Sequence, residues 1–417
     1  MIFPKNEHLK VCMYANALLG VWPYIFENNP TLRKLYNIYS KATFTYYLLY
    51  ILTAIIQLVI LLTRQEINVK EVFANLAITL LYSVTIMRVY AIKSTRMRNI
   101  IKEIMDLEDK TMASGDKQII EIYEFHTTQS KVSNVIFLVN IFIGKTFSKY
   151  CLLKNIQIRL VNIPPLFVED IIKFDVEKNE TISIKALPLS SWFPYDEQKH
   201  YLASYLWHIL DGSIGASFVM YTDIFTFSLI IFPLGQIHIL KHILRHFNEY
   251  ALKIKHQLGV TEEEASFITI RECILKHNSI IRYINDFNKE MRNIMVLDFL
   301  QSSLQLASVV IQLLVTQMNL INFIYSAQFT VSMLIRLLVY YWYGNEIIVE
   351  SSNIAVAIWE SEWYEESKKV KNLMLIMMMR CNRELCLEIG PFNTMSLNTL
   401  IGILKATYSY MMVIYRR

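Results

Sequence analysis

Three histidines share one face of a long apolar segment. His238, His242 and His246 are four residues apart, so a helix places all three imidazoles on the same side. Two such imidazoles can bind zinc. Lys241 and Arg245 alternate with them, however, and no cysteine or carboxylate nearby in the sequence completes a ligand set. We therefore expect no metal site and interpret this stretch as a basic helix beside a membrane surface.

The sequence contains no recognisable catalytic motif. No phosphate-binding loop, no His-Glu-x-x-His pair and no Gly-x-Ser-x-Gly turn occurs in the sequence. The net charge of +5 is small for a nucleic-acid binder, and no basic stripe with interleaved aromatic residues is present. We expect no catalytic activity, no cofactor and no nucleic-acid partner.

The apolar residues fall into long windows separated by charged stretches. The chain has 417 residues, of which 54% are hydrophobic and 18% charged, and its mean hydropathy is +0.31. A soluble chain carries about a quarter charged residues, and a helix needs about 20 mostly apolar residues to cross a bilayer. We therefore predict an all-α membrane protein with seven transmembrane helices. The expected spans are 42–62, 72–92, 132–153, 201–240, 293–316, 320–343 and 392–415.

Basic residues determine the orientation that we expect. Lys and Arg are concentrated before the first span and in the second, fourth and sixth loops, and such loops stay in the cytoplasm. This pattern predicts a cytoplasmic N-terminus and an extracellular C-terminus. The sequon that begins at Asn179 lies in the long third loop, 154–199, on the expected outer side, which makes Asn179 a candidate for glycosylation. Of the five cysteines, only Cys151 lies near that side, so we expect no structural disulfide there.

A dense pattern of aromatic and small residues occupies the last third of the chain. A small-aromatic exit from the sixth span is followed by an acidic-Ser pair, two tryptophans four residues apart, a Gly-Pro-Phe turn and a Thr-Tyr-Ser-Tyr run. The residues are Tyr341-Trp342-Tyr343-Gly344-Asn345-Glu346, Glu350-Ser351, Trp359, Trp363, Gly390-Pro391-Phe392 and Leu404-Lys405-Ala406-Thr407-Tyr408-Ser409-Tyr410. In this order they resemble the insect odorant receptor family. Weaker matches extend the resemblance upstream, at Gly20-Val21-Trp22-Pro23 and Gly235-Gln236.

The resemblance implies a ligand-gated, nonselective cation channel in the plasma membrane of sensory neurons. In such channels four subunits form a ring, and the last span of each subunit lines one central pore. The second loop, 93–131, is shorter than that of the family's co-receptor, so the chain is similar to a tuning subunit that binds a small volatile odorant. Its expected partners are a co-receptor subunit in a heterotetramer and membrane lipid.

The same resemblance predicts how the chain is divided. We expect a cytoplasmic N-terminal segment (1–41), spans one to four (42–240), a cytoplasmic loop with a helical extension (241–292), spans five and six (293–344), a cytoplasmic anchor helix (345–391) and a pore-lining seventh span (392–417).

Two other functions remain open. A gustatory-type receptor would work as a homomeric channel. Its last span would carry Gln-Phe where this chain has Ile414-Tyr415, and this difference favours an odorant receptor. A secondary transporter would contain paired repeats with Gly- or Pro-broken spans, and the sequence does not divide into such halves.

The polar residues of the last span predict that this helix lines the pore. Thr407 and Ser409 are polar among apolar neighbours, as a water-facing helix requires. The alternative is an ordinary packed helix, in which Ser and Thr bond to their own backbone. The resemblance to the family implies that its apolar gate lies at Val413. A ring of four valines, one from each subunit, would block ions there by dewetting.

The ligand cavity is expected in the outer halves of spans two to six. Small apolar volatiles suit a pocket of aromatic residues with one or two hydrogen-bonding groups, and the alternative for each candidate is ordinary packing. The candidates are Tyr82, Phe147, His208, Gly212, Tyr325 and Phe329. Acids inside a span are costly unless they are paired or face water. Asp211 could therefore hydrogen-bond a ligand, and we expect Asp223 to pair with a polar group of a neighbouring span.

Overall fold

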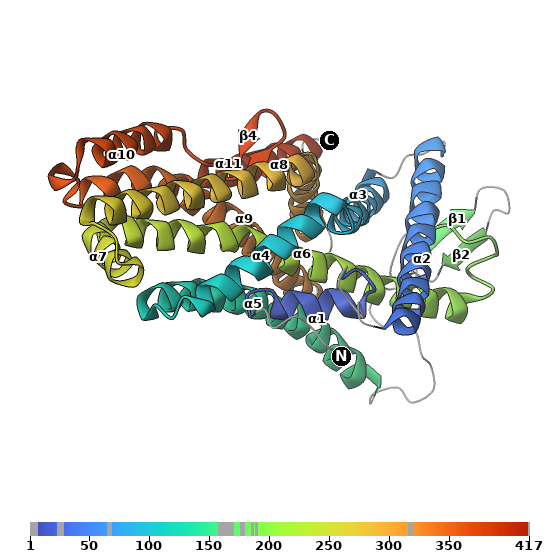
Figure 1. Cartoon of the computed structure of the whole chain (residues 1–417). Helices are drawn as coiled ribbons and strands as arrows, with labels where there is room; N and C mark the ends of the chain where they lie inside the picture. Colours follow the sequence, from blue (N-terminus) through green and yellow to red (C-terminus); the bar gives the residue numbers. More distant parts are fainter. Residues whose placement is uncertain are drawn as a thin grey trace.

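The chain folds into an elongated bundle of α-helices (Figure 1). The structure, a computed structural model, describes residues 7–22, 29–64, 69–156, 171–175, 180–184, 187, 191–315 and 320–415. The helices in this part of the chain are α1 (Lys10–Leu18), α2 (Pro30–Thr63), α3 (Val69–Ile92), α4 (Thr95–Ala113), α5 (Lys117–Ile156), α6 (Tyr201–Arg245), α7 (Phe247–Leu258), α8 (Glu262–Val315), α9 (Leu320–Trp359), α10 (Lys368–Cys381) and α11 (Leu397–Tyr415). The short elements are the strands β1 (Ile171–Asp175), β2 (Glu180–Ile184), β3 (Glu388–Ile389) and β4 (Asn393–Thr394) and the 3-10 helix η1 (Trp363–Glu365).

Each predicted span falls on a long helix. The seven helices are α2, α3, α5, α6, α8, α9 and α11. Among the described residues, Pro30–Thr63, Asn75–Ile92 and Tyr201–Arg245 are long and apolar enough to cross a membrane by length and composition alone. Helix α8 has 54 residues, which gives about 80 Å at about 1.5 Å per residue and exceeds a hydrocarbon core of about 30 Å. The predicted all-α architecture is confirmed, and its longest helices reach beyond a bilayer.

The last helix begins later than predicted. The apolar window starts at residue 392, but α11 starts at Leu397. Gly390 has a φ of 60° and turns the chain from β3 into β4, where Ile389 pairs with Asn393. The prediction was wrong here because counting apolar residues ignores the breaking effect of glycine and proline. A second hairpin, β1–β2, lies in the third loop.

Helix α6 forms the centre of the bundle. It contacts α5, α8 and α9 as well as α1, α2 and α3. Between residues 222 and 237 every residue is buried, so other helices cover this mostly apolar segment on all sides. This helix is therefore the element through which the others are positioned.

A proline inside α6 is accommodated by a tyrosine of α8. Pro233 has no backbone N–H, so the carbonyl of Leu229, four residues earlier, has no partner within the helix. The hydroxyl of Tyr283 donates a hydrogen bond of 2.8 Å to that carbonyl. Because a buried carbonyl must be satisfied, this contact allows the helix to continue through the proline.

The turn between α7 and α8 is formed by local sequence motifs. Gly259 ends α7 in the left-handed conformation, with φ at 65°. Thr261 and Glu264 then form a capping box: the Thr261 hydroxyl accepts from the Glu264 N–H at 3.3 Å, and the Glu264 carboxylate accepts from the Thr261 N–H at 3.1 Å. This turn starts the long helix α8 beside α7.

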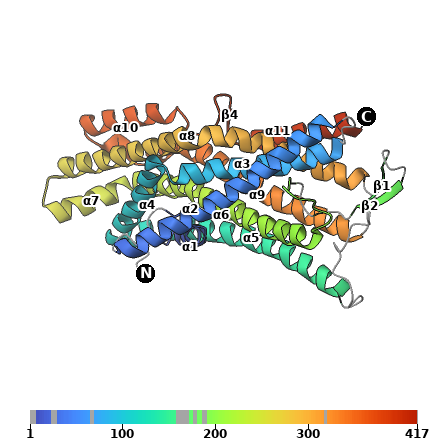
Figure 2. The same ribbon diagram turned by 90° about the vertical axis from the view of Figure 1, so that its right-hand side faces the viewer.

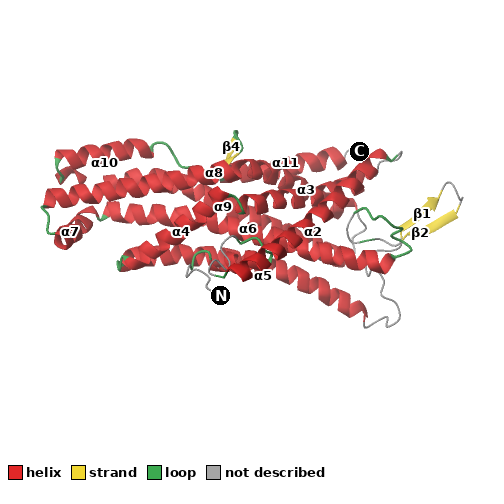
Figure 3. Cartoon of the chain, turned by 45° about the vertical axis from the view of Figure 1, so that its right-hand side comes forward, coloured by secondary structure: helices red, strands yellow, loops and turns green. Residues whose placement is uncertain are grey.

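The bundle has two distinct ends. Figures 2 and 3 show α7 and α10 at one end, which we call the anchor end, and the β1–β2 hairpin at the other, which we call the hairpin end. The C-terminal end of α11 points toward the hairpin end. Helices α6, α8 and α9 run along the long axis between the two ends and so connect them.

Candidate functional site

Four charged side chains from four different helices meet inside the bundle. Arg88 of α3 donates hydrogen bonds to Asp223 of α6 and, at 2.6 Å, to Asp298 of α8. Arg336 of α9 bonds to the same two carboxylates, with its Nε 2.8 Å from Asp223 Oδ2. Tyr340 of α9 adds a hydrogen bond of 2.7 Å to Asp223. We call these five residues the core charge network.

The network is neutral as a whole and almost completely buried. The charged side chains are at most 5% exposed. Two guanidinium groups face two carboxylates, and the Arg336 and Arg88 guanidinium carbons lie 5.4 Å and 5.7 Å from the centre of the Tyr340 ring. Burying ions is costly unless each is paired and hydrogen-bonded. The set therefore works as a unit, because removing one member leaves an opposite charge without compensation.

The sequence prediction found part of this arrangement. The expectation that Asp223 pairs with a polar group of a neighbouring span is confirmed. Arg88, Asp298 and Arg336 also stand out in the sequence as lone charges in apolar windows, but their common meeting point was missed. The usable signal was that two acids and two bases occur in four separate windows, since charges inside a membrane tend to pair with one another.

The core charge network is connected to the last helix. Arg336 donates a hydrogen bond of 3.2 Å to the hydroxyl of Ser302 on α8. The next residue, Ser303, offers its backbone carbonyl to Thr407 of α11 at 3.3 Å. The Thr407 hydroxyl also lies 2.9 Å from the carbonyl of Ile403, one turn earlier in its own helix. Hydrogen bonds to two adjacent residues of α8 therefore connect the network to α11.

Helix α11 leaves one face uncovered by its own chain. Its other face packs on α8 and α9. Tyr408 is 59% exposed and Leu404 is 44% exposed, and Ile401, Lys405 and Ser409 are exposed at the same helical spacing. No other described part of the chain covers this stripe. Ser409 also bonds to the carbonyl of Lys405 at 3.0 Å, as in an ordinary helix, and the side chain of Val413 lies outside the described residues.

A second polar group lies toward the hairpin end of α6. Tyr46 of α2 donates a hydrogen bond of 2.5 Å to Asp211 Oδ1. His208, one turn earlier on α6, contacts the hydroxyl of Ser191 at 2.6 Å. The remaining oxygen of Asp211, Oδ2, and the remaining ring nitrogen of His208, Nδ1, are buried and have no partner among the described residues. Both atoms are free to bond a polar group that enters here.

Aromatic residues of α2 and α3 pack beside this group. The ring of Tyr82 lies 5.7 Å from that of Tyr47 and 5.3 Å from that of Tyr50. On α6, one turn after Asp211, Gly215 faces the Tyr82 ring so closely that an added Cβ would lie 2.7 Å from it. The glycine is therefore needed for α3 and α6 to approach with Tyr82 between them.

The predicted ligand residues are only partly brought together. Tyr82 of α3 is buried against α6, and on α6 itself His208 is buried and Gly212 half-buried. Phe329 is 39% exposed on α9 and does not belong to this buried group. The side chains of Phe147 and Tyr325 lie outside the described residues, as does Asn179.

The histidine face of α6 differs from the expectation in one respect. A carboxylate does lie nearby, because Glu350 of α9 is 3.1 Å from His238 Nε2 and also accepts a hydrogen bond from Lys241. His126 of α5 meets the other nitrogen of His238 at 2.6 Å. The sequence could not reveal this, since Glu350 is more than a hundred positions away from Lys241. Within the described part of the chain, no group of three such side chains is placed to hold a metal ion.

The family-like residues near the end of α9 hold α9 against the segment that leads into α11. A Cβ on Gly344 would lie 2.6 Å from Met395, so only glycine allows this approach. Asn345 accepts a hydrogen bond from the N–H of Leu397 at 3.5 Å, at the start of α11. Ser351 accepts one from the N–H of Leu385 at 2.9 Å. These motif residues fix where the last helix starts.

Comparison with known proteins identifies the family. The family model described as 7tm Odorant receptor matches residues 68–408. Odorant receptor 10 of Aedes albopictus is 27% identical over 199 residues, or 48% of this chain and 51% of that protein. The odorant receptor coreceptor of Aedes aegypti is 23% identical over 161 residues, or 37% and 33%. The chain thus matches about half of the first relative's length and a third of the second's.

A solved structure has the same fold along almost the whole chain. The insect olfactory receptor OR5 from Machilis hrabei, in complex with eugenol, superposes with a TM-score of 0.75 over 98% of this chain and 97% of that one, at 14% identity. The family pattern predicted from the last third of the sequence is confirmed. The chain belongs to the 7tm odorant receptor family.

Proposed function

We propose that this chain is the odorant-binding, tuning subunit of a nonselective cation channel in the plasma membrane of olfactory sensory neurons. The observation that carries the proposal is that α3 and α6 hold both the hairpin-end polar group and the core charge network, and that hydrogen bonds connect this network through α8 to α11. Family membership supports the same function. The stronger similarity to Odorant receptor 10 than to the coreceptor supports a tuning role.

The ligand would bind between α2, α3 and α6 near the hairpin end. Tyr82 supplies an aromatic wall, Gly212 is a half-buried residue without a side chain on α6, and Asp211 and His208 each hold a buried polar atom without a partner in the described chain. A small volatile with one hydroxyl or carbonyl group suits this combination. The eugenol complex of the Machilis receptor supports a ligand of this size. Phe147 and Tyr325 remain candidates for further wall residues, whereas Phe329 is 39% exposed on α9 and is not part of this group.

Ligand binding would be coupled to the pore because the same helices carry both groups. Helix α3 holds Tyr82 and, less than two turns later, Arg88, while α6 holds Asp211 and then Asp223. A ligand that separates α3 from α6 favours a different arrangement of the core charge network. The contact between Ser303 and Thr407 then transmits that change to α11.

The ion path would follow α11 at the centre of a four-subunit ring. Its uncovered face brings Ser409 and Lys405 to the axis, and Val413 forms the apolar gate. The anchor end lies in the cytoplasm and the hairpin end outside, which makes Asn179 accessible to glycosylation. The co-receptor subunits complete the ring.

Electrophysiology in a heterologous cell tests the proposal. The chain is expressed alone, with an insect co-receptor, and the co-receptor is expressed alone as the control, under a panel of volatiles that includes eugenol. We expect odour-evoked cation current only when both chains are present. Val413→Ala should raise the leak current in the same cells. Current from the chain alone would contradict the tuning role, and an unchanged leak would contradict the gate.

A further inference from the structure

A cavity lies at the anchor end, far from the proposed odorant site. It is formed by α4, α6, α7 and α8 and has a volume of about 410 Å³, within the usual range of about 300–1,000 Å³ for small-molecule pockets. Most of its wall is apolar. Examples of these side chains are Leu107, Phe232, Ile243, Ile254 and Ile280.

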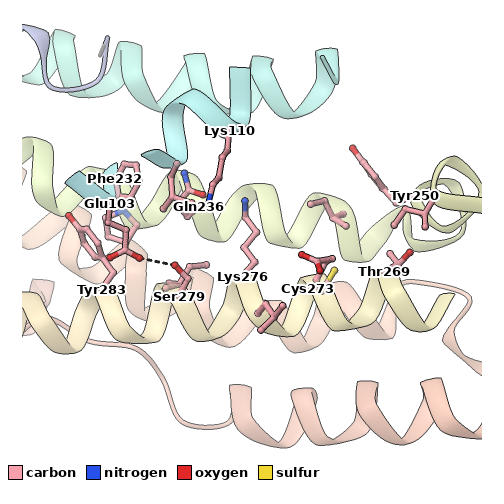
Figure 4. A pocket seen from close by; sticks show the side chains of 17 residues that line it. Glu103, Lys110, Phe232, Gln236, Tyr250, Thr269, Cys273, Lys276, Ser279 and Tyr283 are labelled. Carbon is pink, nitrogen blue, oxygen red and sulfur yellow. Dashed lines mark hydrogen bonds between the residues drawn. The ribbon is translucent and has the colours of Figure 1, made fainter. Parts of the chain in front are cut away.

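One cation in this cavity has no partner. Lys276 of α8 is half-buried and makes no ion pair or hydrogen bond with any residue that the structure describes. Figure 4 shows its side chain extending from α8 toward α6, with Lys110 extending from α4 into the same region. Lys241, by contrast, is paired with Glu350. Lys276 thus presents an ammonium group without a direct ionic partner in a mostly apolar wall.

A buried amide on the opposite wall also lacks a partner. Gln236 of α6 is 3% exposed, and its amide nitrogen Nε2 has no hydrogen-bond acceptor within the described chain. An unsatisfied buried donor is costly. Two carboxylates, Glu103 and Glu272, also line the cavity, and Glu103 accepts a hydrogen bond of 2.9 Å from Ser279. Among the described residues neither carboxylate bonds to Gln236 or Lys276, so both donors are left for a ligand.

The charged state of Lys276 supports the same conclusion. Burial lowers the pKa of Lys276 to about 8, because the apolar surroundings disfavour the ammonium ion. An anion that enters the cavity would offset this penalty. A ligand that matches the whole site must therefore combine a negative head group with an apolar body.

We propose that this cavity binds a single-chain anionic amphiphile. Its acidic head group, a carboxylate or a phosphate monoester, would accept hydrogen bonds from Lys276 and Gln236, and its hydrocarbon chain would lie along the apolar wall. A free fatty acid and a single-chain phospholipid both carry this chemistry, and both are available at the inner membrane surface. The site is separate from the proposed odorant site and does not depend on channel activity.

Photo-crosslinking of the full-length chain in lipid nanodiscs tests the proposal. The probe is dodecanoate with a diazirine at the end of its chain, and labelled peptides are mapped by mass spectrometry. We expect labelling of α4 or α7 residues that line the cavity, such as Leu107 or Ile254. Dodecanoate and dodecyl phosphate should compete, and dodecanol should not. The better of the two competitors identifies the source of the head group.

Variants separate the head-group contact from general lipid binding. Lys276→Met should weaken binding about 10- to 100-fold, as expected for loss of a charge-assisted hydrogen bond, and Lys276→Arg should retain it. Gln236→Leu provides an independent test of the same head-group site. Lys289→Met is the matched control on α8, since Lys289 is 62% exposed and bound to Asp286. Equal competition by dodecanol, or wild-type labelling of Lys276→Met, would overturn the proposal.

Discussion

The core charge network gives the sharpest test of how this bundle is held together. In Asp223→Asn the shape of the side chain is kept, but the carboxylate that accepts from Arg88, Arg336 and Tyr340 is lost. Two guanidinium groups then share only Asp298. Breaking a buried ion pair by removing one partner costs about 3–5 kcal/mol. At about 1.4 kcal/mol per tenfold, the ratio of folded to unfolded protein falls by about two to three and a half orders of magnitude.

The measurement is the free energy of unfolding by sodium dodecyl sulfate in mixed micelles, followed by circular dichroism. Asp211→Asn is the matched control on the same helix. Asp211 has one described partner, Tyr46, and the amide oxygen of an asparagine can still accept the hydrogen bond from the Tyr46 hydroxyl. Its cost should be about 0.5–1.5 kcal/mol, the range of a single hydrogen bond. A loss below about 1 kcal/mol for Asp223→Asn would refute the view that the network is a buried, mutually dependent set.

A paired variant separates charge balance from packing. Arg88→Met combined with Asp223→Leu removes one base and one acid, and leaves Arg336 facing Asp298. Replacing a buried pair by apolar residues is often neutral or stabilising. We expect the double variant to be much more stable than the sum of its single variants. Additive losses would show that the two side chains act independently.

Two further predictions concern sensing and coupling. Gly215→Ala places a methyl group 2.7 Å from the Tyr82 ring, so we expect a higher odorant concentration for half-maximal current. A dose–response curve equal to that of the wild type would contradict the assigned packing. Thr407→Val keeps the volume of the side chain but loses the hydroxyl that contacts the Ser303 carbonyl. The odorant concentration for half-maximal current should therefore shift by about 2- to 10-fold, the equivalent of one hydrogen bond, while surface expression, measured by labelling, stays unchanged. An unshifted dose–response curve would exclude this contact from the coupling path.

Local sequence patterns predicted the helices well, because each span is a continuous apolar window. Pairing between helices was not predictable in the same way. Arg88 lies 135 positions from Asp223 and 210 positions from Asp298, and nothing local to any of them specifies the partner. The sequence indicates only that such charges need partners.

The helix ends, unlike the partners of the buried charges, could have been predicted from local sequence. The capping box of Thr261 and Glu264 and the turn at Gly259 are readable in the sequence, although a search for apolar windows passes over them. The late start of α11 after Gly390 was missed for the same reason. Of the residues predicted for the ligand site, Tyr82 is buried whereas Phe329 is exposed. The exposure of Phe329 could not be predicted because the sequence does not specify how α9 is rotated.

The neutrality of the core charge network also restricts how this protein can diverge. A single mutation at Arg88, Asp223, Asp298 or Arg336 leaves an unpaired charge in a site with almost no access to water. Evolutionary change at these positions must therefore occur as a joint replacement of one acid and one base, or through a short-lived unstable intermediate. Related receptors should keep all four charges, keep one complete pair, or have none. The same residues that stabilise the bundle would then record, in their covariation, which lineages have rebuilt its centre.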